Sequence, residues 1–126
     1  MNKSFKPTES ELDILSILWE KQRATVREVH EIIQQTKEVG YTTTLKLMQI
    51  MHEKGLVTRD ETSKTHIYIP YFEKGKAQEQ YVSKMIKTLF SGSTSQLVMQ
   101  ALGHHKASPS DLIEIKKMIE SLEKRK

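Results

Sequence analysis

Residues 41–70 read YTTTLKLMQIMHEKGLVTRDETSKTHIYIP, and the first half of this stretch predicts a helix. The positions that share one helical face at three- and four-residue spacing are Thr44, Leu47, Met48 and Met51. We expect a threonine hydroxyl within residues 41–43 to cap the N-terminus of this helix. Lys54 places a cation in the last turn, and Gly55 suits the left-handed conformation that ends many helices.

The second half of the stretch predicts a β-hairpin. Residues 56–59 are strand-like, residues 60–64 are rich in turn formers, and residues 65–69 alternate with β-branched side chains before Pro70. A polar-faced helix followed directly by a hairpin is the arrangement of a winged helix-turn-helix. In that arrangement the helix enters the DNA major groove and the hairpin, or wing, lies against the neighbouring backbone.

Two helix starts precede this stretch. Thr8 with Glu11, and Thr25 with Glu28, each match the capping box, in which the two side chains satisfy each other's backbone amides. The apolar positions that follow are Leu12, Leu15, Ile17, Leu18 and Trp19 in the first helix and Val26, Val29, Ile32 and Ile33 in the second. A polar turn over residues 34–40 leads into the next helix. We therefore assign residues 1–71 to a winged-helix DNA-binding domain.

Residues 72–126 predict three amphipathic helices and no sheet. The apolar positions expected to form a dimer interface are Tyr81, Val82, Met85, Ile86, Leu89, Phe90, Leu97, Val98, Leu112, Ile115, Ile119 and Leu122. The breaks fall at residues 91–93 and 103–107, and Ser108–Pro109 starts the last helix. Three such helices bury little alone, so we expect them to pack against a second copy as a dimerisation domain. The fold class is mainly α with a small β-hairpin wing.

Composition excludes several classes of function. The chain has 126 residues and no cysteine, which excludes disulfides, thiolate metal sites and cysteine nucleophiles. No apolar run is long enough to span a membrane, and the N-terminal residues lack a signal-peptide segment, so we expect a cytoplasmic protein. The net charge of +4 arises entirely in residues 72–126, because residues 1–71 hold ten Lys or Arg and ten Asp or Glu. No paired carboxylates or nucleophile motif indicate an enzyme.

Polar and cationic side chains on the predicted helix and wing are candidates for contact with double-stranded DNA. They are Thr25, Arg27, Tyr41, Thr42, Thr43, Lys46, Gln49, Arg59, Lys64 and His66. Gln49 has the groups to bond adenine, and Lys46 to bond guanine or a phosphate, whereas wing cations would contact phosphates without reading sequence. The alternative is an ordinary solvated helix face and a charged hairpin that avoids aggregation.

The chain resembles the penicillinase repressor family of bacterial winged-helix regulators. The matching pieces are TESELDILSILWEKQRATVREVHEII, YTTTLKLMQIMHEKGLVTR, THIYIP, LFSGSTSQLV and SPSDLIEIKKMIESL, in family order. The resemblance implies a homodimeric repressor that binds a palindromic operator through its N-terminal domains, with antibiotic-resistance or stress genes as targets. Two helix positions, Leu45 and Ile50, carry apolar residues where the family usually has basic ones.

The resemblance also suggests how repression is relieved. In family members near β-lactamase genes, a membrane-sensor protease cuts an Asn–Phe bond in the dimerisation arm. Gln100–Ala101 stands at the corresponding position here, so the resemblance does not extend to that cleavage pair. Copper-responsive members carry C-terminal cysteine pairs, which this chain lacks. No cofactor is expected.

Two other functions compete with DNA binding. A winged helix that binds proteins is favoured by the neutral N-terminal half and by an exposed Leu45 and Ile50. A metal-responsive regulator would use the adjacent His104 and His105, although exposed loop histidines are the simpler interpretation. His30 and His52 are expected on helix surfaces.

Overall fold

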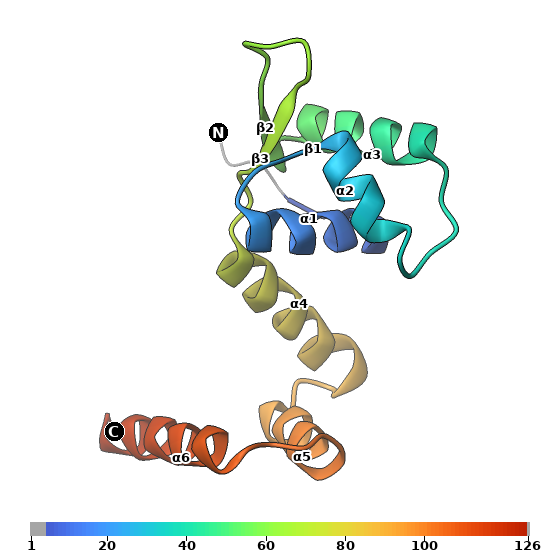
Figure 1. The fold of residues 1–126 in the computed structure, drawn as a ribbon. Coiled ribbons are helices and arrows are strands. Elements are labelled where there is room, and N and C mark those ends of the chain that lie inside the picture. The colour runs from blue at the N-terminus through green and yellow to red at the C-terminus, as the bar shows by residue number, and fades with distance from the viewer. Residues whose placement is uncertain (1–4, 126) are drawn as a thin grey trace. The chain divides into compact units, whose positions relative to one another are not determined.

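The computed structural model describes residues 5–125, so the first four residues of the N-terminal segment and Lys126 lie outside the described residues. The elements in chain order are α1 (Glu9–Lys21), β1 (Ala24–Thr25), α2 (Val26–Ile33), α3 (Tyr41–Lys54), β2 (Val57–Asp60), β3 (Ile67–Pro70), α4 (Lys74–Leu89), α5 (Thr94–His104) and α6 (Pro109–Lys124) (Figure 1). The chain divides into a first unit, Met1–Gln80, and a second unit, Tyr81–Lys126.

Capping boxes begin three of these helices. The predicted boxes of α1 and α2 are confirmed: Thr8 Oγ1 accepts from the Glu11 amide at 3.2 Å, and Thr25 Oγ1 accepts from the Glu28 amide at 3.2 Å. A third box, not anticipated, begins α6, where Ser108 Oγ accepts from the Asp111 amide at 3.0 Å. Its N3 residue is an aspartate, whereas the usual capping-box pattern has glutamate or glutamine there.

The two ends of α3 differ in how well they were predicted. The expected threonine cap is wrong, because Gly40 is the N-cap and no side chain hydrogen-bonds there. The predicted glycine stop is confirmed: Gly55 has φ 84° and ψ 11°, in the left-handed region that glycine adopts without steric cost.

A small antiparallel sheet forms the wing, and its strand order is β1-β3-β2. The predicted hairpin is confirmed, with Val57 opposite Pro70 and Asp60 opposite Ile67. The two-residue strand β1 was not predicted. It pairs Ala24 with Tyr68, which joins the start of α2 to the base of the wing.

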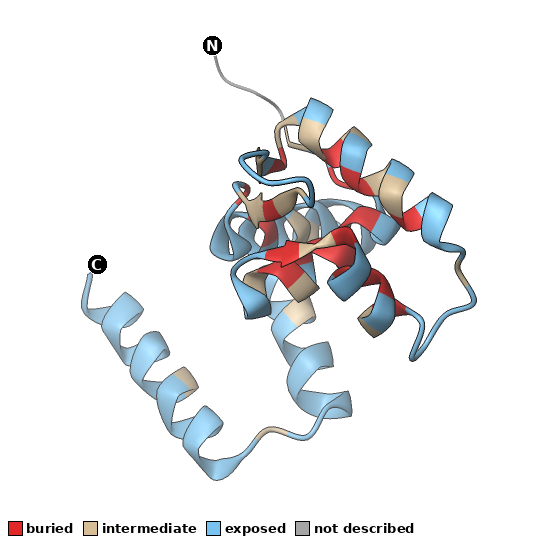
Figure 2. Cartoon of the chain, turned by 45° about the horizontal axis from the view of Figure 1, so that its top comes forward, coloured by how far each residue is buried: buried red, intermediate tan, exposed pale blue. Residues whose placement is uncertain are grey.

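The core of the first unit lies between α1, α2, α3 and the sheet (Figure 2). Leu15 and Leu18 from the face predicted for α1, and Met48 and Met51 from the face predicted for α3, are fully buried, so these parts of both faces point inward. The predicted face of α1 did not include Ile14, which is fully buried, and its Leu12, Ile17 and Trp19 are only partly buried. Phe72, in the segment that leads into α4, and Ala77, in α4 itself, complete this core. The indole Nε1 of Trp19 donates to the Phe72 carbonyl at 2.8 Å, which holds that segment against α1.

One ion pair joins a buried carboxylate on α1 to an exposed lysine at the end of α3. Glu11 is only 2% exposed, and its Oε1 accepts from Lys54 Nζ at 2.7 Å and from the Thr8 amide at 2.9 Å. A buried carboxylate needs such donors, because an unpaired charge away from water is costly. Glu11 therefore caps α1 and ties it to the last turn of α3.

The second unit has no buried residue among residues 81–125. Ser91 and Gly92, with φ 48° and 84°, end the α4 segment. The predicted loop at 103–107 begins two residues later than expected, because α5 continues through His104. No helix among the described residues combines the length and apolar character needed to cross a membrane.

Candidate nucleic-acid interface

The outward face of α3 carries the polar side chains predicted to meet DNA. Thr42, Thr43, Lys46 and Gln49 are all exposed. Leu45 and Ile50 were expected to be exposed as well, but both are half-buried, and Leu45 packs against the core. The accessible surface of this helix is therefore more polar than its sequence indicates. No acidic residue occurs in α3 before Glu53.

The N-terminal ends of α2 and α3 meet in a small cluster. The Arg27 guanidinium carbon lies 5.4 Å from the centroid of the Tyr41 ring, a cation–π distance. His30 meets the same ring edge-on, at 5.5 Å between centroids. His30 Nδ1 and Thr44 Oγ1 form a buried hydrogen bond of 2.9 Å. The expectation of a surface histidine at position 30 is wrong, because α3 covers it.

The burial of His30 fits its position on α2, although a polar side chain is usually expected at the surface. His30 lies on the same α2 face as Val26 and Ile33, which are buried too. The periodicity of the apolar residues would have placed it inward, but its polarity argued for the surface. Thr44, fully buried, supplies the partner that makes the position tolerable.

The three residues of the wing that were predicted to contact DNA have different surroundings. Arg59 is occupied: its Nε donates to Glu61 Oε2 at 2.6 Å, and its guanidinium reaches the Tyr68 hydroxyl at 3.4 Å. These partners raise the pKa of Arg59, and its guanidinium lowers the pKa of Glu61. Lys64 is exposed in the turn, and His66 is half-buried before β3.

The turn of the wing is built by Asp60. Its Oδ1 accepts from the Thr62 amide at 3.0 Å and from the Thr62 hydroxyl at 2.7 Å. The amide hydrogen bond lowers the pKa of Asp60, because it favours the charged carboxylate. Side-chain oxygens that bind the backbone two residues on favour tight turns, so this contact presents Lys64 at the end of the hairpin.

Ion pairs sort the cations of the first unit into two groups. Four acidic residues are paired with basic ones: Glu11 with Lys54, Asp13 with Lys37, Asp60 with Arg23 and Glu61 with Arg59. Among the described cations of this unit that form no ion pair, Arg27, Lys46 and Lys64 lie on α2, on α3 and in the turn of the wing. The unit is neutral in sum, yet these three cations remain free to meet phosphate.

Comparison with known proteins identifies the family. A profile of the penicillinase repressor family matches residues 7–121. The chain belongs to the penicillinase repressor family. The resemblance predicted from its motifs and the mainly helical, winged fold class are thereby confirmed. Members of this family are transcriptional repressors, a class without catalytic activity.

The similarity to individual relatives is low and extends over nearly whole chains. The methicillin resistance regulatory protein MecI of Staphylococcus aureus (strain N315) is 21% identical over 118 residues, 94% of this chain and 96% of its own. MecI of Mammaliicoccus sciuri is 20% identical over the same shares. The penicillinase repressor of Staphylococcus aureus is 19% identical over 124 residues, 98% of each chain.

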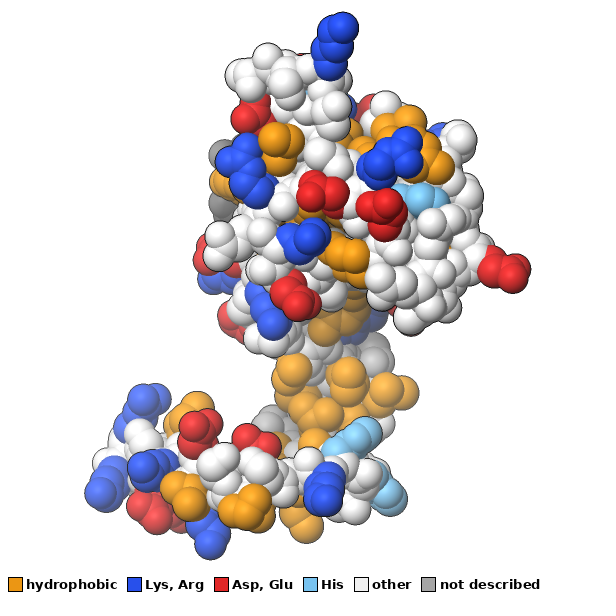
Figure 3. Space-filling model, viewed as in Figure 1, with side chains coloured by type: hydrophobic (Ala, Val, Ile, Leu, Met, Phe, Trp, Pro, Cys, Tyr) orange, Lys and Arg blue, Asp and Glu red, His pale blue; other side chains and the backbone are white. Residues whose placement is uncertain are grey.

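The second unit carries the positions predicted for dimerisation on exposed or half-exposed surface. Exposed are Val82, Met85, Leu89, Val98, Leu112, Ile119 and Leu122, and half-buried are Tyr81, Ile86, Phe90, Leu97 and Ile115. Hydrophobic side chains accordingly dominate parts of its visible surface (Figure 3). Met99, Leu102, Ile113 and Met118 are exposed apolar residues that the prediction omitted. Their presence widens the apolar surface beyond one helical stripe.

The other predicted features of this unit lie on α5. Gln100 and Ala101 are exposed within the helix. His104 is in its last turn and His105 is its C-cap. In residues 5–125, no three His, Asp or Glu side chains gather closely enough to hold a metal ion.

Proposed function

We propose that this family member represses transcription by binding a palindromic operator as a homodimer in the cytoplasm. The observation that carries the proposal is the outward row of α3, in which Thr42, Thr43, Lys46 and Gln49 are exposed and no acidic side chain intervenes. A helix of this kind fits the major groove, where its side chains reach base edges.

Each exposed group has a partner in the groove. Gln49 carries the paired donor and acceptor that bond adenine, and Lys46 donates to guanine or a phosphate. The threonine methyls of positions 42 and 43 contact thymine methyl groups. Arg27, stacked on Tyr41, and Lys64, at the turn of the wing, flank this row and contact phosphates.

A second copy doubles these contacts. The exposed apolar face of α4, α5 and α6 is the surface through which two chains would associate. Two winged helices related by a two-fold axis then meet half-sites one or more helical turns apart. Any event that separates the copies weakens operator binding steeply, because the second contact becomes intermolecular.

The test compares two pairs of substitutions in fluorescence anisotropy with the chain's own upstream DNA and a scrambled duplex. Lys46→Ala and Gln49→Ala should each weaken binding to the upstream DNA by about 10- to 100-fold, the range of one base contact. Lys21→Ala and Gln34→Ala, at exposed positions on α1 and at the end of α2, are the matched controls. Equal losses in both pairs, or no loss in either, would refute recognition by α3.

A protein partner is the second candidate, favoured by the neutral charge of residues 1–71. Salt separates the two. DNA binding should fall steeply between low and moderate salt, because it releases counterions from the phosphates and this release gains less entropy as the salt concentration rises. A salt-independent association of the α3 face would favour the protein partner.

A further inference from the structure

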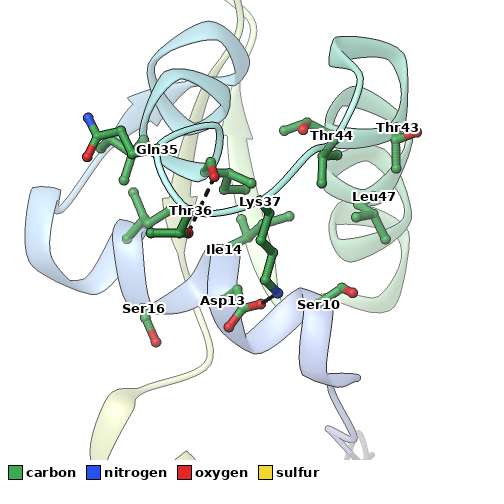
Figure 4. Close-up of a pocket in the computed structure, with 14 residues that line it drawn as sticks. Ser10, Asp13, Ile14, Ser16, Gln35, Thr36, Lys37, Thr43, Thr44 and Leu47 are labelled. Atoms are coloured by element: carbon green, nitrogen blue, oxygen red, sulfur yellow. Dashed lines mark hydrogen bonds and ion pairs between the residues drawn. The ribbon is translucent and has the colours of Figure 1, made fainter.

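A groove of about 350 Å³ lies between α1, α2, α3 and the turn that joins α2 to α3 (Figure 4). Its aliphatic walls come from all four segments: Ile14, Ile17, Ile32, Ile33, Val39 and Leu47. Small-molecule sites in proteins begin at about 300 Å³ and are lined mainly by apolar side chains with a few polar groups. The size and lining of the groove both fit that class of site.

The charges at the groove cancel. Lys37 reaches across from the turn to the Asp13 carboxylate on α1 (Figure 4), and this hydrogen bond raises the pKa of Lys37. Those two are the formal charges among the lining residues, and they form an ion pair with each other. An ionic ligand would find no free counter-charge. Among the remaining polar groups, the Thr43 hydroxyl can form a neutral hydrogen bond, and Thr36 Oγ1, which donates to the Ile33 carbonyl at 3.5 Å, can still accept one.

The groove is also lined by the first turn of α3, the end of that helix that has no side-chain cap. Thr43 and Thr44 line it from the first turn of α3, whose N-cap supplies no side-chain hydrogen bond. That turn is held by packing, by backbone hydrogen bonds from the Thr43 and Thr44 amides to the Gly40 carbonyl, and by the hydrogen bond between Thr44 Oγ1 and His30 Nδ1. A molecule seated against Val39 and Leu47 would therefore press on the start of the helix that carries Lys46 and Gln49.

We propose that this groove is the binding site of a small, neutral, mainly apolar molecule, and that occupation changes the DNA affinity of the repressor. The second clause rests on the proposed function, whereas the first does not. The ligand enters beside the Lys37–Asp13 pair, lies along the aliphatic walls and directs a polar group to the threonines.

The test uses the full chain labelled with ¹³C at its isoleucine methyl groups, and 2-naphthol as the neutral aromatic probe. Four isoleucines line the groove, at positions 14, 17, 32 and 33. Ile67 and Ile69 in the wing, and Ile113 and Ile119 in the second unit, serve as internal controls. We expect saturable shifts at the four groove methyls only, and an affinity at least about tenfold lower for the charged analogue 2-naphthoate, which must leave water without a partner.

Val39→Phe, which fills the groove from the turn, should abolish those shifts, and Leu47→Phe is a second filling variant. Val98→Phe on α5 makes the same change outside the groove and should leave the titration intact. Shifts that spread equally to Ile113 and Ile119, or that do not saturate, would overturn the site.

The proposed effect of groove occupation on DNA affinity is tested separately, by anisotropy with saturating 2-naphthol. The affinity of the wild-type chain should change by about threefold or more, and that of the filled variants should not. Saturable groove shifts with an unchanged DNA affinity would overturn the coupling and keep the site. Absence of any DNA binding would overturn the proposed function and the coupling, and the methyl titration would still decide the site.

Discussion

The two units of this chain contain similar fractions of apolar residues, but the first unit buries many of them and the second leaves them exposed or half-exposed. The first unit buries fourteen hydrophobic residues between three helices and a sheet. In the second unit Leu89 is 73% and Met99 71% exposed, and no residue from 81 to 125 is buried. The difference is geometric, because amphipathic helices close a core only when elements face each other from several directions.

This contrast shows where each unit obtains its stability. Burial of apolar surface is the main favourable term in folding, and the first unit obtains it within one chain. The second unit leaves apolar stripes uncovered that a second copy would cover. In the proposed dimer, association would therefore rest on a different part of the sequence from the folding of the first unit.

The largest expected effect is on the free energy of unfolding, and it compares one leucine from each unit. Leu15→Ala removes a fully buried side chain and should lower the free energy of unfolding by about 2–5 kcal/mol. Leu89→Ala should change it by less than about 1 kcal/mol. Urea unfolding followed by the fluorescence of Trp19, the single tryptophan, reports on the first unit alone. Equal losses for both variants would break the comparison.

The next prediction concerns the second unit. Ile119→Asp places a carboxylate on the apolar face of α6 and should weaken the dimer at least about 100-fold, because an unpaired buried charge costs several kcal/mol. Sedimentation equilibrium measures the dimer. Ser121→Asp, the same change of charge on the opposite face of the helix, is the control and should leave the dimer intact. The Trp19-reported unfolding of the first unit should be unchanged in both.

A smaller effect contrasts the cations of the two units. Although residues 72–126 carry the net positive charge, the proposed phosphate contacts lie in the neutral first part. Lys64→Ala should therefore reduce the slope of log affinity against log salt by about one unit per protomer. Lys117→Ala, on α6, should leave the slope unchanged in the same DNA titration. The reverse result would move the DNA contact to the second unit.

The smallest effect is a pH dependence confined to the first unit. The backbone amide of Thr25 donates to Glu28 and lowers the pKa of that carboxyl below its ordinary value. A lowered pKa stabilises the fold above the ordinary value, and this contribution is lost as the pH falls through the folded-state pKa. Glu28→Gln should thus be less stable than wild type near about pH 7, with the difference vanishing by about pH 3. Urea midpoints across that range measure it, and a constant difference would contradict it.

The local features were predictable because their causes are local. The capping boxes at Thr8 and Thr25 need only residues three apart, and the stop at Gly55 needs only a backbone without a Cβ. Inward faces followed from helical spacing. The family also followed from sequence, since motif order survives at about one-fifth identity.

The tertiary structure decided what each surface side chain is free to do. Sequence could not show that α3 covers His30, that β1 joins the sheet, or that Arg59 is held by Glu61 and Tyr68. It could not show that Lys37 neutralises Asp13 across an apolar groove. Asp13 and Lys37 are 24 residues apart in the chain and meet only when the helices pack. No local sequence pattern encodes the distance between such residues. The sequence alone therefore determined the helices, the hairpin and the family, and the packing decided which charges and apolar faces remain available to partners.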